Sequence, residues 1–388
     1  MATAGCVVGA DRGSPGSLLA ILGPLVGQAD SKPEGSTLVS ASHEVVAMEV
    51  ELTTVADDEA VLFVGSEVRH HIDLDPDTDY VLDDVEVHTL PRPPGDLLSV
   101  VATVNDVHFG ETRCGVIDGT DVGPILSVEE GEPPYPETMN RAALAEILAL
   151  RDGAGPDAVV AKGDLTTIGT DEEYRQFLDC YQVGLGDRLH HVRGNHDAYH
   201  GGTFAAEAPF EVSLPGVILA VIDTTRPGHA NGQVTTDDLE WLDELGARAD
   251  RPVLVFGHHH VWSPLSKRRE SGYFGIVPDD SDRLIEVVAR RAALTGYFAG
   301  HTHRNRVRRF PATGDFPWVE VGSTKDYPGA WAEYRVYEGG VLQIMRRISA
   351  PEALDWTNRT RAMFGGMYAG YSFGALEERC FPVWPRQG

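Results

Sequence analysis

Five short polar clusters in this sequence contain the residue types that bind metal ions and move protons. They are Asp106-Val107-His108, Gly163-Asp164, Gly194-Asn195-His196-Asp197, Gly257-His258-His259-His260 and Gly300-His301-Thr302-His303. Carboxylate and amide oxygens with imidazole nitrogens, and no thiolate, form a ligand set suited to Mn, Fe or Zn. Two cations about 3.5–4 Å apart can clamp a phosphoryl group and lower the pKa of a bridging water. The clusters therefore predict a dinuclear metal centre for phosphoester hydrolysis without a covalent intermediate.

The third cluster contains side chains that could act directly on a substrate. His196 can transfer a proton near neutral pH, and Asp197 can hold that imidazole in one orientation. Asn195 offers a neutral carbonyl oxygen to a metal ion, and Asp164 can bridge two cations through its two oxygens. We therefore expect His196 and Asp197 to be catalytic, and the other clusters to supply metal ligands together with Asn195.

Each cluster follows an apolar run with the length of a strand. The runs are Leu97–Val104, Ala158–Ala161, Leu189–Val192, Val253–Phe256 and Tyr297–Ala299. Helical patterns separate them, namely Pro136–Leu150, Asp171–Cys180, a helix capped by Thr235 or Thr236, and Asp282–Ala293. After His303 the sequence is rich in short strands, which favours a second sheet. This alternation predicts a layered α/β fold.

Both ends of the chain differ from this alternating middle part. Apolar residues alternate from about His43 and predict a half-buried strand at Val46–Leu52. The segments Leu74–Tyr80 and Val85–Leu90 resemble the later strands of a fibronectin type III sandwich, and Pro91–Gly95 is typical of a stiff linker. We expect an N-terminal region at 1–95 with a small β-sandwich-like module from about residue 43, a main domain at 96–350 and a C-terminal tail at 351–388, in which Asp355–Gly388 fits no regular element.

Composition limits the kinds of partner. The chain has 388 residues, 42% of them hydrophobic, and a formal net charge of −27, which disfavours binding to a nucleic acid polymer through bulk charge. Four scattered cysteines without a CxxC pair indicate reduced thiols and a cytoplasmic protein. The apolar run Leu18–Val26 is too short to span a bilayer, and we interpret it as a packing element. The sequence does not indicate an oligomeric state.

In their order and spacing, the five clusters resemble the calcineurin-like metallophosphoesterase superfamily, whose pattern is DxH, GD, GNH(D/E), H and GHxH. The resemblance implies a layered β-sandwich flanked by helices and attack by a metal-bridging hydroxide. It implies that one ion is held by Asp106, His108, Asp164 and His303, and the other by Asp164, Asn195, His258 and His301. His196 would contact the phosphoryl group or protonate the leaving alcohol.

Two branches of that superfamily show closer resemblances. Val255–Ser263 is similar to a strand end of purple acid phosphatases, and their N-terminal β domain would match residues 43–90. Those enzymes carry GDxxY with a tyrosinate ligand, whereas Thr167 stands at that position here. His108 and the compact Gly300–Asn305 are instead similar to class III cyclic nucleotide phosphodiesterases and glycerophosphodiesterases. This favours a small phosphodiester substrate, such as cAMP or a glycerophosphodiester.

Several alternatives stay open at this point. That branch usually has a proline after the paired histidines, so His258 is the first choice as ligand and His259 the second. The side chains of Arg113, Arg193, Arg304 and Asn305 could contact substrate or form ordinary salt bridges and surface contacts. The enzyme could also be a phosphomonoesterase of nucleotides or phosphoproteins. A non-catalytic binding scaffold is the alternative from another class of protein.

Overall fold

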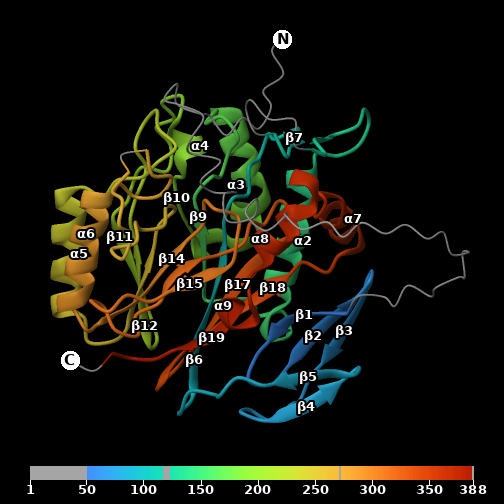
Figure 1. Cartoon of the computed structure of the whole chain (residues 1–388), viewed down its shortest axis with the longest axis horizontal. Coiled ribbons are helices and arrows are strands. Elements are labelled where there is room, and N and C mark those ends of the chain that lie inside the picture. Colours follow the sequence, from blue (N-terminus) through green and yellow to red (C-terminus); the bar gives the residue numbers. More distant parts are fainter. Residues whose placement is uncertain (1–49, 117–122, 271, 387–388) are drawn as a thin grey trace, which may run out of the picture.

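The apolar runs of the sequence form strands in two six-stranded sheets (Figure 1). A computed structural model describes residues 50–116, 123–270 and 272–386. The first sheet has the order β10-β9-β6-β17-β18-β19, with β6 at Leu97–Val104, β9 at Ala158–Lys162, β10 at Leu189–Val192, β17 at Ala330–Tyr337, β18 at Gly340–Arg347 and β19 at Cys380–Val383. The second has the order β11-β12-β13-β14-β16-β15, with β11 at Phe210–Leu214, β12 at Val217–Val221, β13 at Val253–Phe256, β14 at Leu294–Ala299, β15 at Arg306–Arg308 and β16 at Trp318–Glu320.

The two sheets face each other across one apolar core. Val101 and Val160 of the first sheet and Leu219 and Phe298 of the second belong to the same buried cluster. Neighbouring strand residues point the other way, because side chains alternate between the two faces of a strand. Ala102, for example, belongs to the cluster that the outer helices cover. Strands buried on both faces explain the nearly continuous apolar runs in the sequence.

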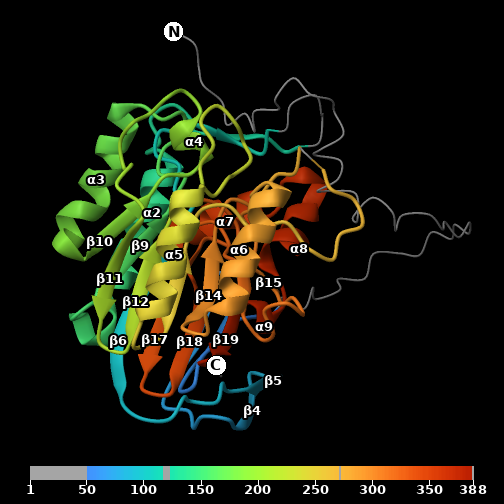
Figure 2. The same ribbon diagram turned by 90° about the vertical axis from the view of Figure 1, so that its left-hand side faces the viewer.

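Helices cover the outer face of each sheet. Helices α2 (Tyr135–Ala149) and α3 (Asp171–Leu185) pack on the first sheet. Helices α5 (Thr236–Arg248) and α6 (Pro278–Arg290) lie side by side on the second (Figure 2). Thr235 caps α5, and α6 begins at Pro278 instead of Asp282, because proline is favoured in the first turn of a helix. The predicted α/β architecture of sheets flanked by helices is confirmed.

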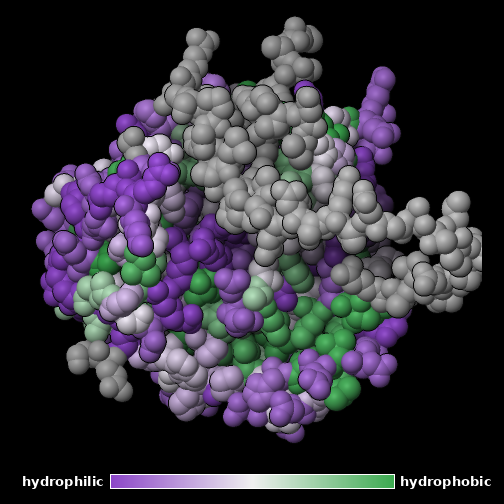
Figure 3. Space-filling view, in the orientation of Figure 1, coloured by the Kyte–Doolittle hydropathy of each residue, from purple (hydrophilic) through white to green (hydrophobic). Residues whose placement is uncertain are grey.

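The outward surfaces of α5 and α6 are mostly hydrophilic, at the left of Figure 3. Their apolar residues, such as Leu242 and Leu284, are turned inward and fully buried. None of the helices in the described part of the chain is long and apolar enough to cross a bilayer. The cytoplasmic location stays a prediction.

Five short strands precede the first sheet. Strands β1 (Val50–Val55), β2 (Ala60–Val64) and β3 (Glu67–His71) form an antiparallel sheet, and β4 (Asp79–Leu82) pairs with β5 (Val85–His88). We call residues 50–95 the N-terminal module. The expected strand at Val46–Leu52 is described only from Val50 onward, and Leu18–Val26 lies outside the described residues. The domain limits stay a prediction.

The C-terminal part of the chain is regular, so the expectation of a tail without structure was wrong. It forms α7 (Pro351–Thr360), α8 (Met367–Phe373), α9 (Leu376–Arg379) and β19, which extends the first sheet beside β18. These helices are short and interrupted by glycines, so their sequence gives little periodic signal, and packing against the main domain stabilises them. We call residues 351–386 the C-terminal segment.

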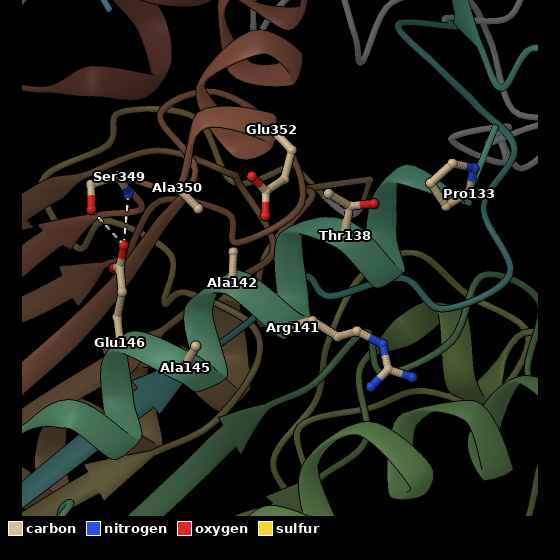
Figure 4. Close-up of a pocket in the computed structure, with 9 residues that line it drawn as sticks. All are labelled: Pro133, Thr138, Arg141, Ala142, Ala145, Glu146, Ser349, Ala350 and Glu352. Carbon is tan, nitrogen blue, oxygen red and sulfur yellow. Dashed lines mark hydrogen bonds between the residues drawn. The ribbon is translucent and has the colours of Figure 1, made fainter. Parts of the chain in front are cut away.

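A shallow hollow marks where α2 meets the start of the C-terminal segment (Figure 4). Glu146 extends from α2 and accepts hydrogen bonds from the backbone N–H and hydroxyl of Ser349, at 2.7 and 2.8 Å. Ala142 and Glu352 line the same hollow. The contact attaches the turn between β18 and the C-terminal segment to the helix layer. The long segment between β6 and α2 contains the short strands β7 (Arg113–Cys114) and β8 (Leu126–Ser127), and a one-turn helix, α4, spans Asn195–Ala198.

Candidate metal centre

The five clusters meet because their strands run in parallel. Strands β6, β9 and β10 are parallel neighbours in the first sheet, and β13 and β14 are parallel neighbours in the second. Each cluster follows the carboxyl end of its strand, and ligand sites of α/β sheets commonly lie at that edge. The structure brings all seven predicted ligands together there: Asp106, His108, Asp164, Asn195, His258, His301 and His303.

The ligand atoms of these residues form overlapping groups. Oxygen or nitrogen atoms of Asp106, His108 and His303 all lie within 4.8 Å of one another, as do those of Asp106, Asp164 and His258. Oδ2 of Asp164 lies 3.5 Å from Nε2 of His108 and 3.3 Å from Nε2 of His258. Asp164 therefore faces both halves of the cluster, as a residue shared by two cations must.

The backbone at the site is strained. Asp106, His108, Asp164, His301 and His303 have positive φ angles between 47° and 69°. Residues other than glycine adopt this conformation at a cost of about 1–3 kcal/mol each, and such outliers cluster at functional sites. The strain turns the side chains toward one another. It is partly offset by a hydrogen bond from the backbone N–H of His301 to the Asp106 carboxylate, at 3.0 Å.

Two glycines allow the loops to approach each other. A Cβ atom on Gly194 would collide with the carboxylate and backbone nitrogen of Asp164. A Cβ atom on Gly300 would lie 2.7 Å from Oδ2 of Asp106. The glycines that precede Asn195 and His301 are therefore required by close packing between neighbouring loops.

Hydrogen bonds on the outer side of two rings determine which nitrogen faces the site. Nδ1 of His258 donates to the carbonyl oxygen of Lys162 at 2.8 Å, so in the neutral ring the lone pair lies on Nε2, which points toward Asp164. Nε2 of His301 donates to the carbonyl oxygen of Phe274 at 2.7 Å, which leaves its lone pair on Nδ1. Outer partners commonly fix the tautomer of metal-binding histidines in this way.

The next histidine, His259, is held in the opposite tautomer. The hydroxyl of Thr224 accepts hydrogen bonds from the backbone N–H groups of His258 and His259, at 3.2 and 3.0 Å. Both of its lone pairs are then used, so its proton points to Nδ1 of His259, 2.9 Å away. Burial and the neighbouring His301 hold the pKa of His259 well below its usual value, so the ring is neutral with its proton on Nε2. Nε2 of His259 is therefore a hydrogen-bond donor, whereas a metal ligand must offer a lone pair.

Asp197 does not orient His196, which corrects the prediction from the sequence. Nδ1 of His196 donates to the carbonyl oxygen of Thr167 at 2.7 Å. The Asp197 carboxylate accepts hydrogen bonds from the backbone N–H groups of Gly194, Leu165 and Thr166 and from the Thr166 hydroxyl. The carboxylate of Asp197 thus ties two ligand-bearing loops together, and a backbone carbonyl orients the imidazole.

Three charged residues at the site were missed from the sequence. Glu111, Lys325 and Asp326 are buried behind His108 and His303. Glu111 lies in the irregular segment after β6, and Lys325 and Asp326 follow β16 by several residues. Their only sequence signal was a position downstream of predicted strands, which is too general to single them out.

The charges of the site fit bound cations. Burial lowers the pKa of His258, but the Asp164 and Asp106 carboxylates and the Lys162 carbonyl together raise it to about 9. Burial likewise lowers the pKa of His303, and Asp326 and Asp106 raise it to about 10. Protons on these rings therefore neutralise carboxylates that a metal ion could neutralise instead. Both ring nitrogens of His108 are buried without a hydrogen-bond partner among the described residues. The residues present fit a metal centre with nitrogen and oxygen ligands.

Three of the other polar residues considered from the sequence have structural partners. Arg193 forms an ion pair with Asp223 at 2.6 Å, and Arg304 forms one with Glu320 at 2.8 Å. Asn305 accepts a hydrogen bond from the backbone of the strand-end loop that follows β16. Arg113 lies half-buried in β7. Ordinary salt bridges and hydrogen bonds within the protein therefore account for the contacts of Arg193, Arg304 and Asn305.

Comparisons with known proteins identify the family of this chain. Residues 99–305 match the family described as calcineurin-like phosphoesterase. Over 180 residues the chain is 29% identical to a glycerophosphodiester phosphodiesterase, GpdQ, from Enterobacter lignolyticus, covering 42% of this chain and 61% of the relative. Over 185 residues it is 33% identical to a cAMP/cGMP dual specificity phosphodiesterase from Mycobacterium tuberculosis, covering 44% of this chain and 51% of the relative. The chain thus spans between half and about three fifths of the length of these relatives.

Among solved structures, a dimetal phosphatase from Danio rerio is similar, with 16% sequence identity and a TM-score of 0.45. The match covers 65% of this chain and 98% of that one. A likeness of this degree says nothing about the substrate.

Proposed function

Because the chain belongs to the calcineurin-like phosphoesterase family, we propose that it is a metal-dependent phosphodiesterase acting on a small phosphodiester, a cyclic nucleotide such as cAMP or a glycerophosphodiester. The observation that carries the proposal is the convergence of the seven candidate ligands, with Asp164 between His108 and His258. The names of the two relatives support the choice of a diester over a monoester. The charge of −27 makes a nucleic acid polymer an unsuitable substrate.

The ligand atoms divide into two sets that share one carboxylate. We assign one Mn, Fe or Zn ion to Asp106, His108, Asp164 and His303. We assign the other to Asp164, Asn195, His258 and His301. When bound, the two ions would supply positive charge to the phosphoryl oxygens and make a water molecule a stronger nucleophile.

His258, and not His259, is the ligand in this assignment. In the neutral ring its lone pair lies on Nε2, and that atom is 3.1 Å from Oδ1 of Asn195 and 3.3 Å from Oδ2 of Asp164. His259 carries its proton on Nε2 because the Thr224 hydroxyl donates to its other nitrogen. The hydrogen bonds around the pair thus support the first choice from the sequence.

His196 is the residue assigned to the substrate. Its Nδ1 is fixed by the Thr167 carbonyl, so Nε2 is the atom left to donate to a phosphoryl oxygen or to the leaving alcohol. The His196 ring lies 4.6 Å from the His108 ring, centroid to centroid, with the planes steeply inclined. His196 is thus next to a candidate ligand without belonging to the assigned ligand sets.

The test is a substrate panel with protein reconstituted with Mn²⁺. We expect bis(p-nitrophenyl) phosphate to be turned over faster than p-nitrophenyl phosphate, and cAMP or a glycerophosphodiester to be hydrolysed. Asn195→Ala should lower diester turnover by more than about 100-fold, since even an outer partner of a metal ligand can be worth that much. Asn358→Ala, at an exposed position of α7, is the matched control.

Faster monoester turnover would favour the phosphomonoesterase alternative. Equal turnover by wild type and Asn195→Ala would reject the assigned site. Fewer than one metal ion per chain after reconstitution would favour the non-catalytic scaffold.

A further inference from the structure

We propose that Lys325 is a positioning residue that fixes two candidate ligands, His108 and His303, through the carboxylates of Glu111 and Asp326. The proposal rests on the proposed function, because it concerns ligands of the same metal ion. It assigns a role to a buried cation that belongs to none of the sequence clusters.

The first arm of this arrangement leads to His108. Nζ of Lys325 lies 2.7 Å from Oε1 of Glu111. The other oxygen of Glu111 lies 3.4 Å from Nδ1 of His108, on the side of the ring that faces away from Asp164. The hydroxyl of Tyr135 also donates to Oε1 of Glu111. Glu111 is therefore held from two directions while it faces the outer nitrogen of His108.

The second arm leads to His303. Nζ of Lys325 lies 3.2 Å from Oδ2 of Asp326, and the same oxygen lies 3.2 Å from Nδ1 of His303. The hydroxyl of Tyr368 donates to the other oxygen of Asp326 at 2.8 Å. Nε2 of His303 is left facing Asp106 at 3.4 Å. One ammonium group thus joins the hydrogen-bond partner of His303 to a carboxylate that lies 3.4 Å from Nδ1 of His108 without hydrogen-bonding to it.

Burial explains why a lysine is needed at this point. Glu111, Lys325 and Asp326 are each no more than 2% exposed. Two carboxylates this close and this far from water are unfavourable without a cation between them. With Lys325 in place, the three groups keep one net negative charge behind the two rings. A carboxylate behind a histidine makes the opposite nitrogen a better ligand and fixes the orientation of the ring.

The C-terminal segment completes the arrangement. Nε1 of Trp356 in α7 donates to the backbone carbonyl of Lys325 at 2.8 Å. The Trp356 ring stacks on Tyr135, with centroids 4.0 Å apart and planes inclined by 14°. Tyr368, which holds Asp326, belongs to α8. The segment that follows the family match thus reaches both arms and sets the position of Lys325.

Metal binding is the appropriate measurement, because it reports on the ligands directly. Mn²⁺ is titrated into metal-free protein, free ion is followed by electron paramagnetic resonance, and the spectrum of bound ion distinguishes a coupled pair from a single ion. We expect Lys325→Met to weaken one of two sites by about 10–100-fold and to replace the coupled signal by that of a single ion. Tyr368→Phe removes a hydroxyl that donates to Asp326 at 2.8 Å and lies 3.4 Å from Nδ1 of His303, and it should weaken the same site by a smaller factor.

Two further variants separate positioning from general damage. Tyr371→Phe changes a neighbouring tyrosine of the same helix and should leave both sites unchanged. The double variant Lys325→Met/Glu111→Gln removes one charge of each sign and should fold better than Lys325→Met, while the site containing His108 stays weakened. If Lys325→Met fails to fold, Tyr368→Phe decides.

The outcomes separate this proposal from the proposed function. Suppose that the wild-type protein binds two ions and hydrolyses diesters. If Tyr368→Phe and folded Lys325→Met then bind both ions as tightly as the wild type, the positioning role alone is overturned. Wild-type protein that binds no ions would overturn both proposals. Loss of one site in the variants, with Tyr371→Phe unaffected, supports the positioning role.

Discussion

A Thr224→Val substitution would remove one buried hydroxyl from the turn that presents His258 while keeping the shape of the side chain. Thr224 is fully buried. Its oxygen accepts hydrogen bonds from the backbone N–H groups of His258 and His259 and donates to the His259 ring. A methyl group in its place can do none of this.

The expected cost follows from the groups left without a partner. An unsatisfied buried N–H costs about 1–3 kcal/mol, so two of them cost about 2–6 kcal/mol of unfolding free energy. Nδ1 of His259 also loses its donor, which removes the constraint on the tautomer of that ring. Relaxation of the turn would reduce the cost by moving His258 away from Asp164. Stability and metal affinity are therefore expected to fall together.

Urea unfolding of the metal-free protein measures the first effect, and Mn²⁺ titration measures the second. Thr224→Ser keeps the hydroxyl and loses only a methyl group, so it is the matched control. Thr224→Ser should cost only about 1 kcal/mol for its buried methyl group, whereas we expect Thr224→Val to differ from wild type by at least about 2 kcal/mol, the lower end of that range. A difference within about 0.5 kcal/mol, the usual spread of harmless surface substitutions, would refute the assignment of Thr224 as the partner of both backbone groups.

Two other predictions concern the same side chains. His258→Ala should abolish one of two Mn²⁺ sites, whereas His259→Ala should keep two bound ions per chain; metal analysis after dialysis decides, and the reverse result would make His259 the ligand. Metal affinity should rise with pH up to about 9, because a metal ion must displace the proton on Nε2 of His258. The Asp164 and Asp106 carboxylates and the Lys162 carbonyl, acting against burial, raise the pKa of that ring to about 9. In the metal-free protein the raised pKa contributes stability that is present below about pH 6.5 and is lost as the pH rises through about 9. Titrations from pH 6 to 9 would contradict this if affinity stayed constant.

The positions of the ligands could be predicted because they depend on local patterns. A buried strand is recognisable as an apolar run, and a polar residue directly after it lies at the carboxyl edge of the sheet. Asp106, Asp164 and His301 all follow this rule. The close approach of the loops was also encoded locally, since Gly194 and Gly300 precede their ligand blocks.

The supporting residues could not be predicted because they depend on contacts distant in sequence. Glu111 and Asp326 are brought behind two histidines by loops without periodic sequence, and 214 positions separate Glu111 from Lys325, its partner. The prediction that Asp197 orients His196 was wrong for a related reason. Which acceptor reaches the His196 ring depends on the path of the loop after β9, and that path brings the carbonyl of Thr167 within 2.7 Å of Nδ1. The residue types alone do not predict the path of that loop.

The carboxylate of Glu51 in β1 links the start of the described chain to its reactive edge. It accepts hydrogen bonds from Arg347 at 2.8 Å, from Arg361 at 2.6 Å and from the Tyr327 hydroxyl at 3.1 Å. Tyr327 is the immediate neighbour of Asp326. Trimming residues 50–95 would take away the anion that two guanidinium groups share, one residue from the partner of His303. A shortened version that begins at residue 96 would therefore lose a charge that holds the chain next to a candidate metal ligand.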